Sequence, residues 1–129
     1  MMTLEEARKY FSEDIYAMET TGIKIDDIGE DFSKCSIDVE NRHMAVGNHV
    51  MGGAIYTLAD FAFAVASNSG DSITFTTSSS ITYLSQPKDM KLIALTFDDG
   101  PSSRITSKVL DILKANDVKA TFFIVNYSD

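Results

Sequence analysis

The stretch that decides the fold is residues 50–69, which read VMGGAIYTLADFAFAVASNS. Between residues 52 and 67 this stretch leaves almost no polar face, which predicts a helix that is buried on most of its sides. Asp60 is the only residue of that helix with a charged side chain, and two adjacent glycines, Gly52 and Gly53, open it. The sequence therefore predicts a hydrophobic central helix that carries a single acid.

Strands are predicted on both sides of this helix. Residues 72–84 alternate apolar and hydroxyl side chains, which is typical of a long strand. Upstream, apolar residues alternate on either side of a turn at residues 29–31 and predict a hairpin. Residues 91–97 and 119–127 are predicted as two further strands, so the central helix has enough strands to form a sheet around it.

A shorter helix is predicted near each end of the chain. Thr3 and Glu6 form a capping-box pattern that is followed by apolar residues at helical spacing, which predicts a short amphipathic helix. Near the other end, residues 103–116 place Ile105, Val109 and Ile112 at helical spacing, while the alternation of a strand is poor.

Composition narrows the class of protein. The 129 residues are of the size of one domain, and 19 acidic against 11 basic residues give a net charge of −8. Nucleic acid and anionic membranes are therefore not expected as partners, because both attract basic patches. No apolar run approaches the roughly twenty residues of a membrane span, and no leader pattern opens the chain, so we expect a cytoplasmic protein.

Metal and disulfide chemistry are not expected either. The single cysteine, Cys35, has no partner for an internal disulfide. Together with only two histidines, His43 and His49, it cannot supply the four ligands of a structural zinc site of Cys and His.

The acid in the apolar helix indicates chemistry. Burial of a carboxylate is costly, so Asp60 is expected to serve as a base, while the first N–H groups of the helix at Gly52 and Gly53 lack helical partners and lie at the positive end of the helix dipole. Together they could polarise a carbonyl group and activate a water. The alternatives are that Asp60 caps a neighbouring backbone or holds a dimer contact, and that the glycines allow close packing of helix and sheet.

Residues 50–69, together with SITYLSQPK at residues 80–88, resemble the central helix and the long strand of hotdog-fold acyl-CoA thioesterases of the phenylacetate-degradation type. The resemblance covers about residues 1–94. It implies an α+β hotdog fold, with an antiparallel sheet wrapped around the helix at residues 52–67, and a homo-oligomer, either a dimer or a tetramer. The long strand at residues 72–84 offers an edge for pairing with a second copy.

The same resemblance implies roles for five residues. Asp60 would be the base or nucleophile and would act across a subunit interface, while Gly53, with Gly52 as a second donor, would bind the oxyanion. Thr76 aligns with a hydroxyl residue that some members use to hold the attacking water; alternatively it is a strand-favouring surface position. Arg104 falls near a basic residue that meets the phosphates of coenzyme A in many members, although a surface arginine is the alternative. No cofactor is implied beyond coenzyme A as part of the substrate.

The chain departs from the thioesterase pattern at two positions. Many members carry His or Gln directly before the glycine pair, where this chain has Met51, and Asn where it has Ala45. Two polar side-chain contacts are therefore expected to be missing. Asn48 or His49 in the same loop could substitute, the alternative for His49 being a solvated surface residue.

Residues 92–125 carry a second resemblance. LTFDDGP at residues 95–101 and KATFFIV at residues 119–125 resemble the opening strand–helix–strand of metal-dependent polysaccharide deacetylases, in which the first Asp of the pair is the catalytic base and the second a metal ligand. We do not expect that activity, because two histidines spaced on one helix are also needed and the chain's two histidines precede the motif. We expect residues 98–101, which include Asp98 and Asp99, to form a turn.

These observations predict a single hotdog-like domain over residues 1–129, in which residues 95–129 are a tail of uncertain origin that completes the sheet. The predicted function is hydrolysis of a small or medium acyl-CoA thioester. Two alternatives remain: a catalytically weak acyl-CoA-binding hotdog protein, and a chimeric chain that carries an inactive polysaccharide deacetylase fragment.

Overall fold

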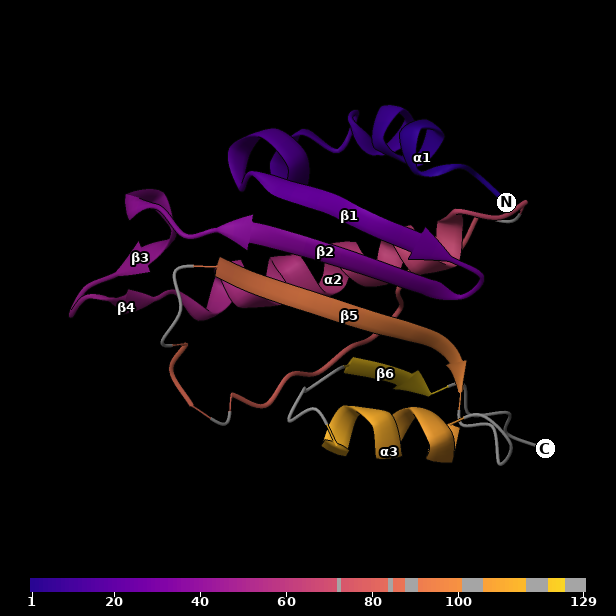
Figure 1. The fold of residues 1–129 in the computed structure, drawn as a ribbon. Coiled ribbons are helices and arrows are strands. Elements are labelled where there is room, and N and C mark those ends of the chain that lie inside the picture. The colour runs from indigo at the N-terminus through magenta and orange to yellow at the C-terminus, as the bar shows by residue number, and fades with distance from the viewer. Residues whose placement is uncertain (72, 84, 88–90, 101–105, 116–120, 125–129) are drawn as a thin grey trace.

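A computed structural model describes the chain except at residues 72, 84, 88–90, 101–105, 116–120 and 125–129. Its main sheet has four strands in the order β1-β2-β5-β6 (Figure 1). These strands are β1 (Ile23–Gly29), β2 (Phe32–Asp38), β5 (Lys91–Gly100) and β6 (Thr121–Ile124). The three main helices are α1 (Leu4–Phe11), α2 (Gly52–Asn68) and α3 (Thr106–Ala115).

Shorter elements connect these parts. A π-helical turn, η1 (Tyr16–Thr20), follows α1, and a 3₁₀ turn, η2 (Asn41–His43), follows β2. A small antiparallel hairpin of β3 (Met44–Ala45) and β4 (His49–Val50) then leads into α2. None of the helices in the described ranges is long and apolar enough to cross a membrane.

The predicted N-terminal helix and hairpin are confirmed. Thr3 caps α1, its hydroxyl accepting a hydrogen bond from the N–H of Glu6 while the Glu6 carboxylate accepts one from the N–H of Thr3. In the hairpin, β1 and β2 pair antiparallel with Ile25 opposite Cys35. Asp31 in the turn has a φ of 53°.

Helix α2 forms where the sequence predicts it but is buried on one face only. The buried residues recur at three- and four-residue spacing, as on one face of a helix against a sheet: Leu58, Phe61, Ala62, Val65 and Ala66. The expectation that the helix is buried on most sides is wrong, because Gly53 and Asp60 lie exposed on its other face. The apolar residues on that face are half-buried, and chain segments outside the sheet lie beside them.

The core lies between α2 and the face of the sheet that β1, β2 and β5 turn toward it. Phe61 of α2 meets Phe11 of α1 edge to face, with ring centroids 5.8 Å apart. Ser33 of β2 donates a hydrogen bond of 2.6 Å to the carbonyl of Ala62, so a polar group inside this core is satisfied by the helix backbone.

The predicted strand at residues 72–84 is wrong. Residues 73–83 form no strand and run, mostly exposed, beside α2, to which hydrogen bonds that involve side chains hold Thr74, Ser79 and Tyr83. The physical reason is the order of the sheet: β2 pairs with β1 and β5, and β5 pairs with β2 and β6. Both edges of β2 and β5 are therefore taken, so the alternating segment has no place beside either of these central strands.

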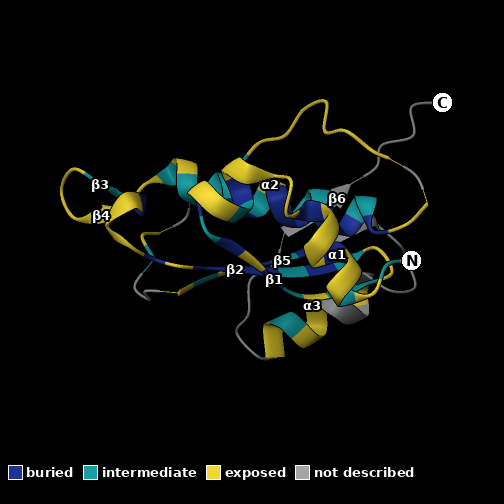
Figure 2. Ribbon diagram, turned by 90° about the horizontal axis from the view of Figure 1, so that it is seen from above, coloured by how far each residue is buried: buried dark blue, intermediate teal, exposed yellow. Residues whose placement is uncertain are grey.

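The tail forms a strand, a helix and a second strand that continue the sheet. β5 is antiparallel to β2, whereas β6 is parallel to β5, which gives a β–α–β unit. Helix α3 lies on the opposite face of the sheet from α2 (Figure 2). The expectation of a turn is wrong for residues 98–100, because β5 continues to Gly100, which pairs with Ile124 of β6.

Candidate active site

The exposed face of α2 carries two of the predicted site residues. Gly53 and Asp60 are both exposed and lie seven residues apart, which is nearly two full helical turns, so they share one face. Their separation along the axis is roughly 10 Å, at 1.5 Å per residue. The predicted burial of Asp60 is therefore wrong for the single chain, because its position on α2 points away from the sheet.

Asp60 lies in a cleft between α2, the end of α1 and the segment after α2. This Asp60 cleft has a volume of about 460 Å³. It brings Asp60 together with Thr76, although the two residues are far apart in sequence and on different elements. Aromatic and aliphatic side chains make up much of the remaining lining: Tyr10, Phe11, Phe63, Ala64, Ile73 and Phe75.

A second hollow of about 460 Å³ adjoins Asp60 on the side of η1. Tyr16 and Tyr56 line it together with Asp60, and the carboxylates of Glu13 and Asp14 line both hollows. The surface around Asp60 is thus aromatic and acidic. Such a surface suits an uncharged apolar group and repels phosphate.

The predicted oxyanion donors lie at the start of α2. Met51 is the N-cap residue and makes no side-chain cap hydrogen bond, so no side chain of the cap occupies the first N–H groups. The Tyr83 hydroxyl donates a hydrogen bond of 2.9 Å to the carbonyl of Gly52, and the Thr57 hydroxyl donates one of 2.8 Å to the carbonyl of Gly53. Each glycine carbonyl therefore accepts a hydrogen bond from a side-chain hydroxyl group.

The residues that replace the usual polar pair are also placed. Met51 is exposed, and Ala45 is half-buried in β3. His49 is exposed on β4, and Asn48 has a φ of 59° in the turn between β3 and β4. Among the described residues, no hydrogen bond joins the side chain of Asn48 or His49 to α2, so their substitution for the missing contacts stays a prediction.

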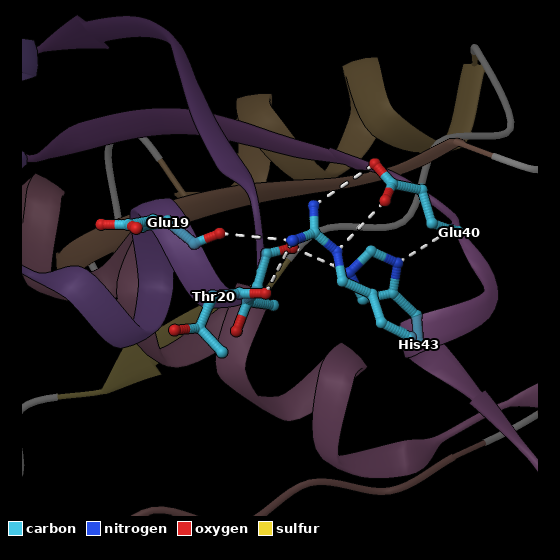
Figure 3. A network of polar contacts seen from close by, with 6 residues as sticks. Glu19, Thr20, Glu40 and His43 are labelled. Carbon is cyan, nitrogen blue, oxygen red and sulfur yellow. Dashed lines mark hydrogen bonds and ion pairs between the residues drawn. The ribbon is translucent and has the colours of Figure 1, made fainter.

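A polar network beside this region has no counterpart in the sequence predictions (Figure 3). His43 is buried, and its Nδ1 accepts a hydrogen bond of 2.8 Å from the N–H of Glu40. Its Nε2 lies 2.8 Å from the carbonyl oxygen of Thr21 and must donate, because a carbonyl only accepts. His43 is therefore the neutral tautomer protonated at Nε2, and both ring nitrogens are engaged.

Arg42 closes the same network. Its guanidinium pairs with the Glu40 carboxylate at 3.2 Å and donates to the carbonyls of Glu19 and Thr20. Gly22, beside the Arg42 guanidinium, has a φ of 75°, a backbone conformation that favours glycine. A lone His and Arg after a strand have no periodic signal, which is why the sequence did not reveal this network.

The remaining predicted positions fall at the limits of the described chain. Arg104 lies outside the described residues, and at Asp98 and Asp99 only the backbone of β5 is described. Within the described ranges, no three His, Cys, Asp or Glu side chains gather as a metal site requires. Both ring nitrogens of His43 are engaged in hydrogen bonds, so neither is free to bind a metal.

The antiparallel strands packed on one long helix define the architecture as an α+β hotdog fold. The chain is similar in structure to the Escherichia coli PaaI protein from the phenylacetic acid degradation operon. The match has a TM-score of 0.59 and 23% sequence identity, and covers 72% of this chain and 71% of that chain. It confirms the predicted hotdog fold and the predicted resemblance in fold to a protein of phenylacetate degradation.

Sequence comparisons match the chain to deacetylases and to an esterase. The polysaccharide deacetylase family matches residues 85–128. The peptidoglycan-N-acetylglucosamine deacetylase PgdA of Listeria monocytogenes is 63% identical over 41 residues, which are 32% of this chain and 9% of that protein. A putative esterase of Archaeoglobus fulgidus is 32% identical over 81 residues, 63% of this chain and 53% of that protein. The chain thus spans about a tenth of PgdA and about half of the esterase.

Proposed function

We propose that the chain hydrolyses small or medium acyl-CoA thioesters. The observation that carries this proposal is the shared cleft of Asp60 and Thr76 on the exposed face of α2, with the glycine start of the same helix about two turns away. The hotdog fold and the similarity to a putative esterase support hydrolysis as the reaction class. The apolar lining of the cleft suits an acyl group, and its carboxylates disfavour the phosphates of coenzyme A there.

In the proposed reaction, Asp60 acts as general base or as nucleophile. As a base, it takes a proton from a water held by the Thr76 hydroxyl, and the water oxygen bonds to the thioester carbon. The N–H of Gly53, with that of Gly52 as a second donor, binds the oxyanion that forms. Collapse of the tetrahedral intermediate breaks the carbon–sulfur bond, and the proton on Asp60 passes to the departing sulfur, so that the acid and the thiol of coenzyme A are released and the carboxylate is restored.

The proposed site uses two copies of the chain. One carbonyl group cannot contact Asp60 and the Gly53 N–H of the same helix, because they lie roughly 10 Å apart along the axis. In the proposed dimer a twofold axis perpendicular to α2 makes the two copies of this helix antiparallel, with Asp60 of one copy opposite Gly53 of the other. A homo-oligomer, dimer or tetramer, therefore belongs to the proposal, as does a cytoplasmic location where acyl-CoA would be met.

Asp60→Asn tests the role of the acid. Turnover, measured by release of free coenzyme A thiol over a panel of acyl-CoA esters, should fall about a hundredfold or more. Because Asp60 is exposed, unfolding stability should change by less than about 0.5 kcal/mol. Asp111→Asn, an exposed carboxylate on α3, is the matched control and should leave turnover unchanged. Unchanged turnover in Asp60→Asn, with tight binding of the ester, would favour the acyl-CoA-binding alternative.

A mixing experiment tests the shared site. Gly53→Pro removes the N–H at a position in the first helical turn, where proline is tolerated. Asp60→Asn and Gly53→Pro should each be inactive alone. After unfolding and refolding together, random dimers should regain about a quarter of the wild-type activity, because half are mixed and each mixed dimer has one intact site of two. A site within one subunit would regain none.

The similarity of residues 85–128 to deacetylases favours a second candidate, a chimeric chain whose tail is an inactive deacetylase fragment. In this chain the fragment would have a structural role, because it supplies strands β5 and β6 to the main sheet. Asp98→Asn with Asp99→Asn, and treatment with a chelator, should then leave thioesterase turnover unchanged. Metal-dependent release of acetate from acetylated sugar oligomers, lost in the double variant, would contradict an inactive tail.

A further inference from the structure

Asn68, at the end of α2, holds the segment that carries Thr76. Its side-chain N–H groups donate to the carbonyl of Ala64 at 2.9 Å and to the carbonyl of Thr74 at 3.1 Å. Its Oδ1 accepts a hydrogen bond of 2.6 Å from the N–H of Thr74. The amide thus makes with Thr74 both hydrogen bonds that a neighbouring strand would make, and the bond to Ala64 fixes it to the helix.

This clamp acts two residues before Thr76. Two residues of chain span at most roughly 7 Å, so a fixed Thr74 limits where Thr76 can lie. Beyond Thr76, the hydroxyl of Ser79 is hydrogen-bonded to that of Tyr56 on α2. Thr76 is therefore held between two anchors on the helix that carries Asp60.

Packing offers little other restraint to this segment. Residues 73–80 are exposed, and Phe75, next to Thr76, is 82% exposed. Asn68, Thr74, Thr76 and Asp60 nevertheless line one cleft. Hydrogen bonds to α2, of which those of Asn68 are the nearest in sequence to Thr76, thus hold this segment at the Asp60 cleft in place of burial.

We propose that Asn68 is a positioning residue, whose amide clamp on Thr74 places the Thr76 hydroxyl to hold the attacking water beside Asp60. This inference rests on the proposed thioesterase function and assigns to Asn68 a role that acts only through Thr76. Removing the clamp should therefore cost what removing the Thr76 hydroxyl costs, and no more.

A double-mutant cycle on turnover tests this role. Asn68→Ala and Thr76→Val should each lower kcat about tenfold with KM within about twofold, and the double variant should be no slower than Thr76→Val alone. Ser67→Ala, which removes a hydroxyl hydrogen bond to the carbonyl of Phe63 on the same helix, should leave kcat unchanged. Asn68→Asp keeps the acceptor for the Thr74 N–H and loses both donors, so its kcat should be intermediate.

Amide hydrogen exchange in the same variants measures whether the hydrogen bonds between Asn68 and Thr74 form, independently of any activity assay. Exchange at Thr74 should be faster in Asn68→Ala and unchanged in Thr76→Val. Multiplied losses of kcat in the double variant, or unchanged exchange at Thr74 in Asn68→Ala, would overturn the role of Asn68 while Asp60→Asn still abolishes turnover. A wild-type chain without thioesterase activity, or a fully active Asp60→Asn, would instead overturn the proposed function and this inference with it.

Discussion

The Tyr83 hydroxyl donates a hydrogen bond of 2.9 Å to the carbonyl of Gly52, and its ring lies against the same glycine, 3.1 Å from where a Cβ would stand. The carbonyl of Gly52 and the N–H of Gly53 belong to one peptide group. A hydrogen bond to that carbonyl polarises the peptide and makes its N–H a stronger donor. Tyr83 thus acts on the proposed oxyanion donor through the peptide plane.

Tyr83→Phe should lower kcat by about threefold to tenfold, the value of one hydrogen bond, with little change in KM. The measurement is turnover of an acyl-CoA ester under saturation. Tyr83→Leu, which also removes the ring, separates the hydroxyl from the packing: kcat should fall at least as far and stability should fall further. Unchanged kcat in Tyr83→Phe would assign Tyr83 to packing alone.

The two histidines should differ sharply in their effect on stability. His43→Leu leaves the N–H of Glu40 and the carbonyl of Thr21 without their partner inside the protein, which should cost about 2–3 kcal/mol of unfolding free energy. His49→Leu, at the exposed position on β4, should cost less than about 0.5 kcal/mol. Urea unfolding of both variants checks this, and equal losses would contradict the network of Figure 3.

Lys24 and Asp38 form an exposed ion pair, with Nζ and Oδ2 2.5 Å apart. This pair should make the stability of the protein weakly dependent on pH, both in acid and in alkali. Its hydrogen bond and charge lower the pKa of Asp38 and raise the pKa of Lys24. The contribution of Asp38 is therefore present above its ordinary pKa and is lost as pH falls through the lowered value. The contribution of Lys24 is present below its ordinary pKa and is lost as pH rises through the raised value.

Asp38→Asn isolates that effect. The difference in Tm between wild type and Asp38→Asn should be largest near neutral pH and should shrink in acid and in strong alkali, and salt should reduce it. A Tm difference that grows as the pH falls would show that the variant acts through something other than the pair.

Cys35 should be unreactive in the native chain. Burial raises the pKa of its thiol to about 12, so almost no thiolate is present at pH 8. Labelling with a disulfide reagent should be about a hundredfold slower in buffer than in urea, which exposes the residue. Rapid native labelling would mean that the sheet opens at β2, and it would also interfere with assays that count released coenzyme A thiol.

Local patterns predicted those elements whose partners are also local. The capping box of Thr3 and Glu6 and the hairpin of β1 and β2 each depend on contacts within a few residues, and both are confirmed. Residues 73–83 have a pattern that is just as regular. They form no strand because the pairing of β2 with β5 depends on a competition between distant segments, which alternation does not encode.

The candidate site was predictable in its residue types but not in its surroundings. A charged residue in an apolar helix marked Asp60 for function, yet its exposure follows from which face α2 turns to the sheet. Leu58, Phe61 and Val65 lie on the face that packs on the sheet. The other face is also largely apolar, so the sequence did not show which of the two faces would be exposed. The clamp of Asn68 on Thr74 joins two elements through side-chain geometry, for which a sequence pattern has no signal.

Strand β5 is hydrogen-bonded to β2 from Lys91 to Phe97 and to β6 at Thr96, Phe97 and Gly100. The part of the chain with deacetylase relatives therefore joins the rest along a ladder and not through a linker. Detaching the tail would leave β2 with an unpaired edge and uncover one side of the helix core. Because that ladder runs the length of β2, we expect the two parts of the chain to unfold together in a single melting transition.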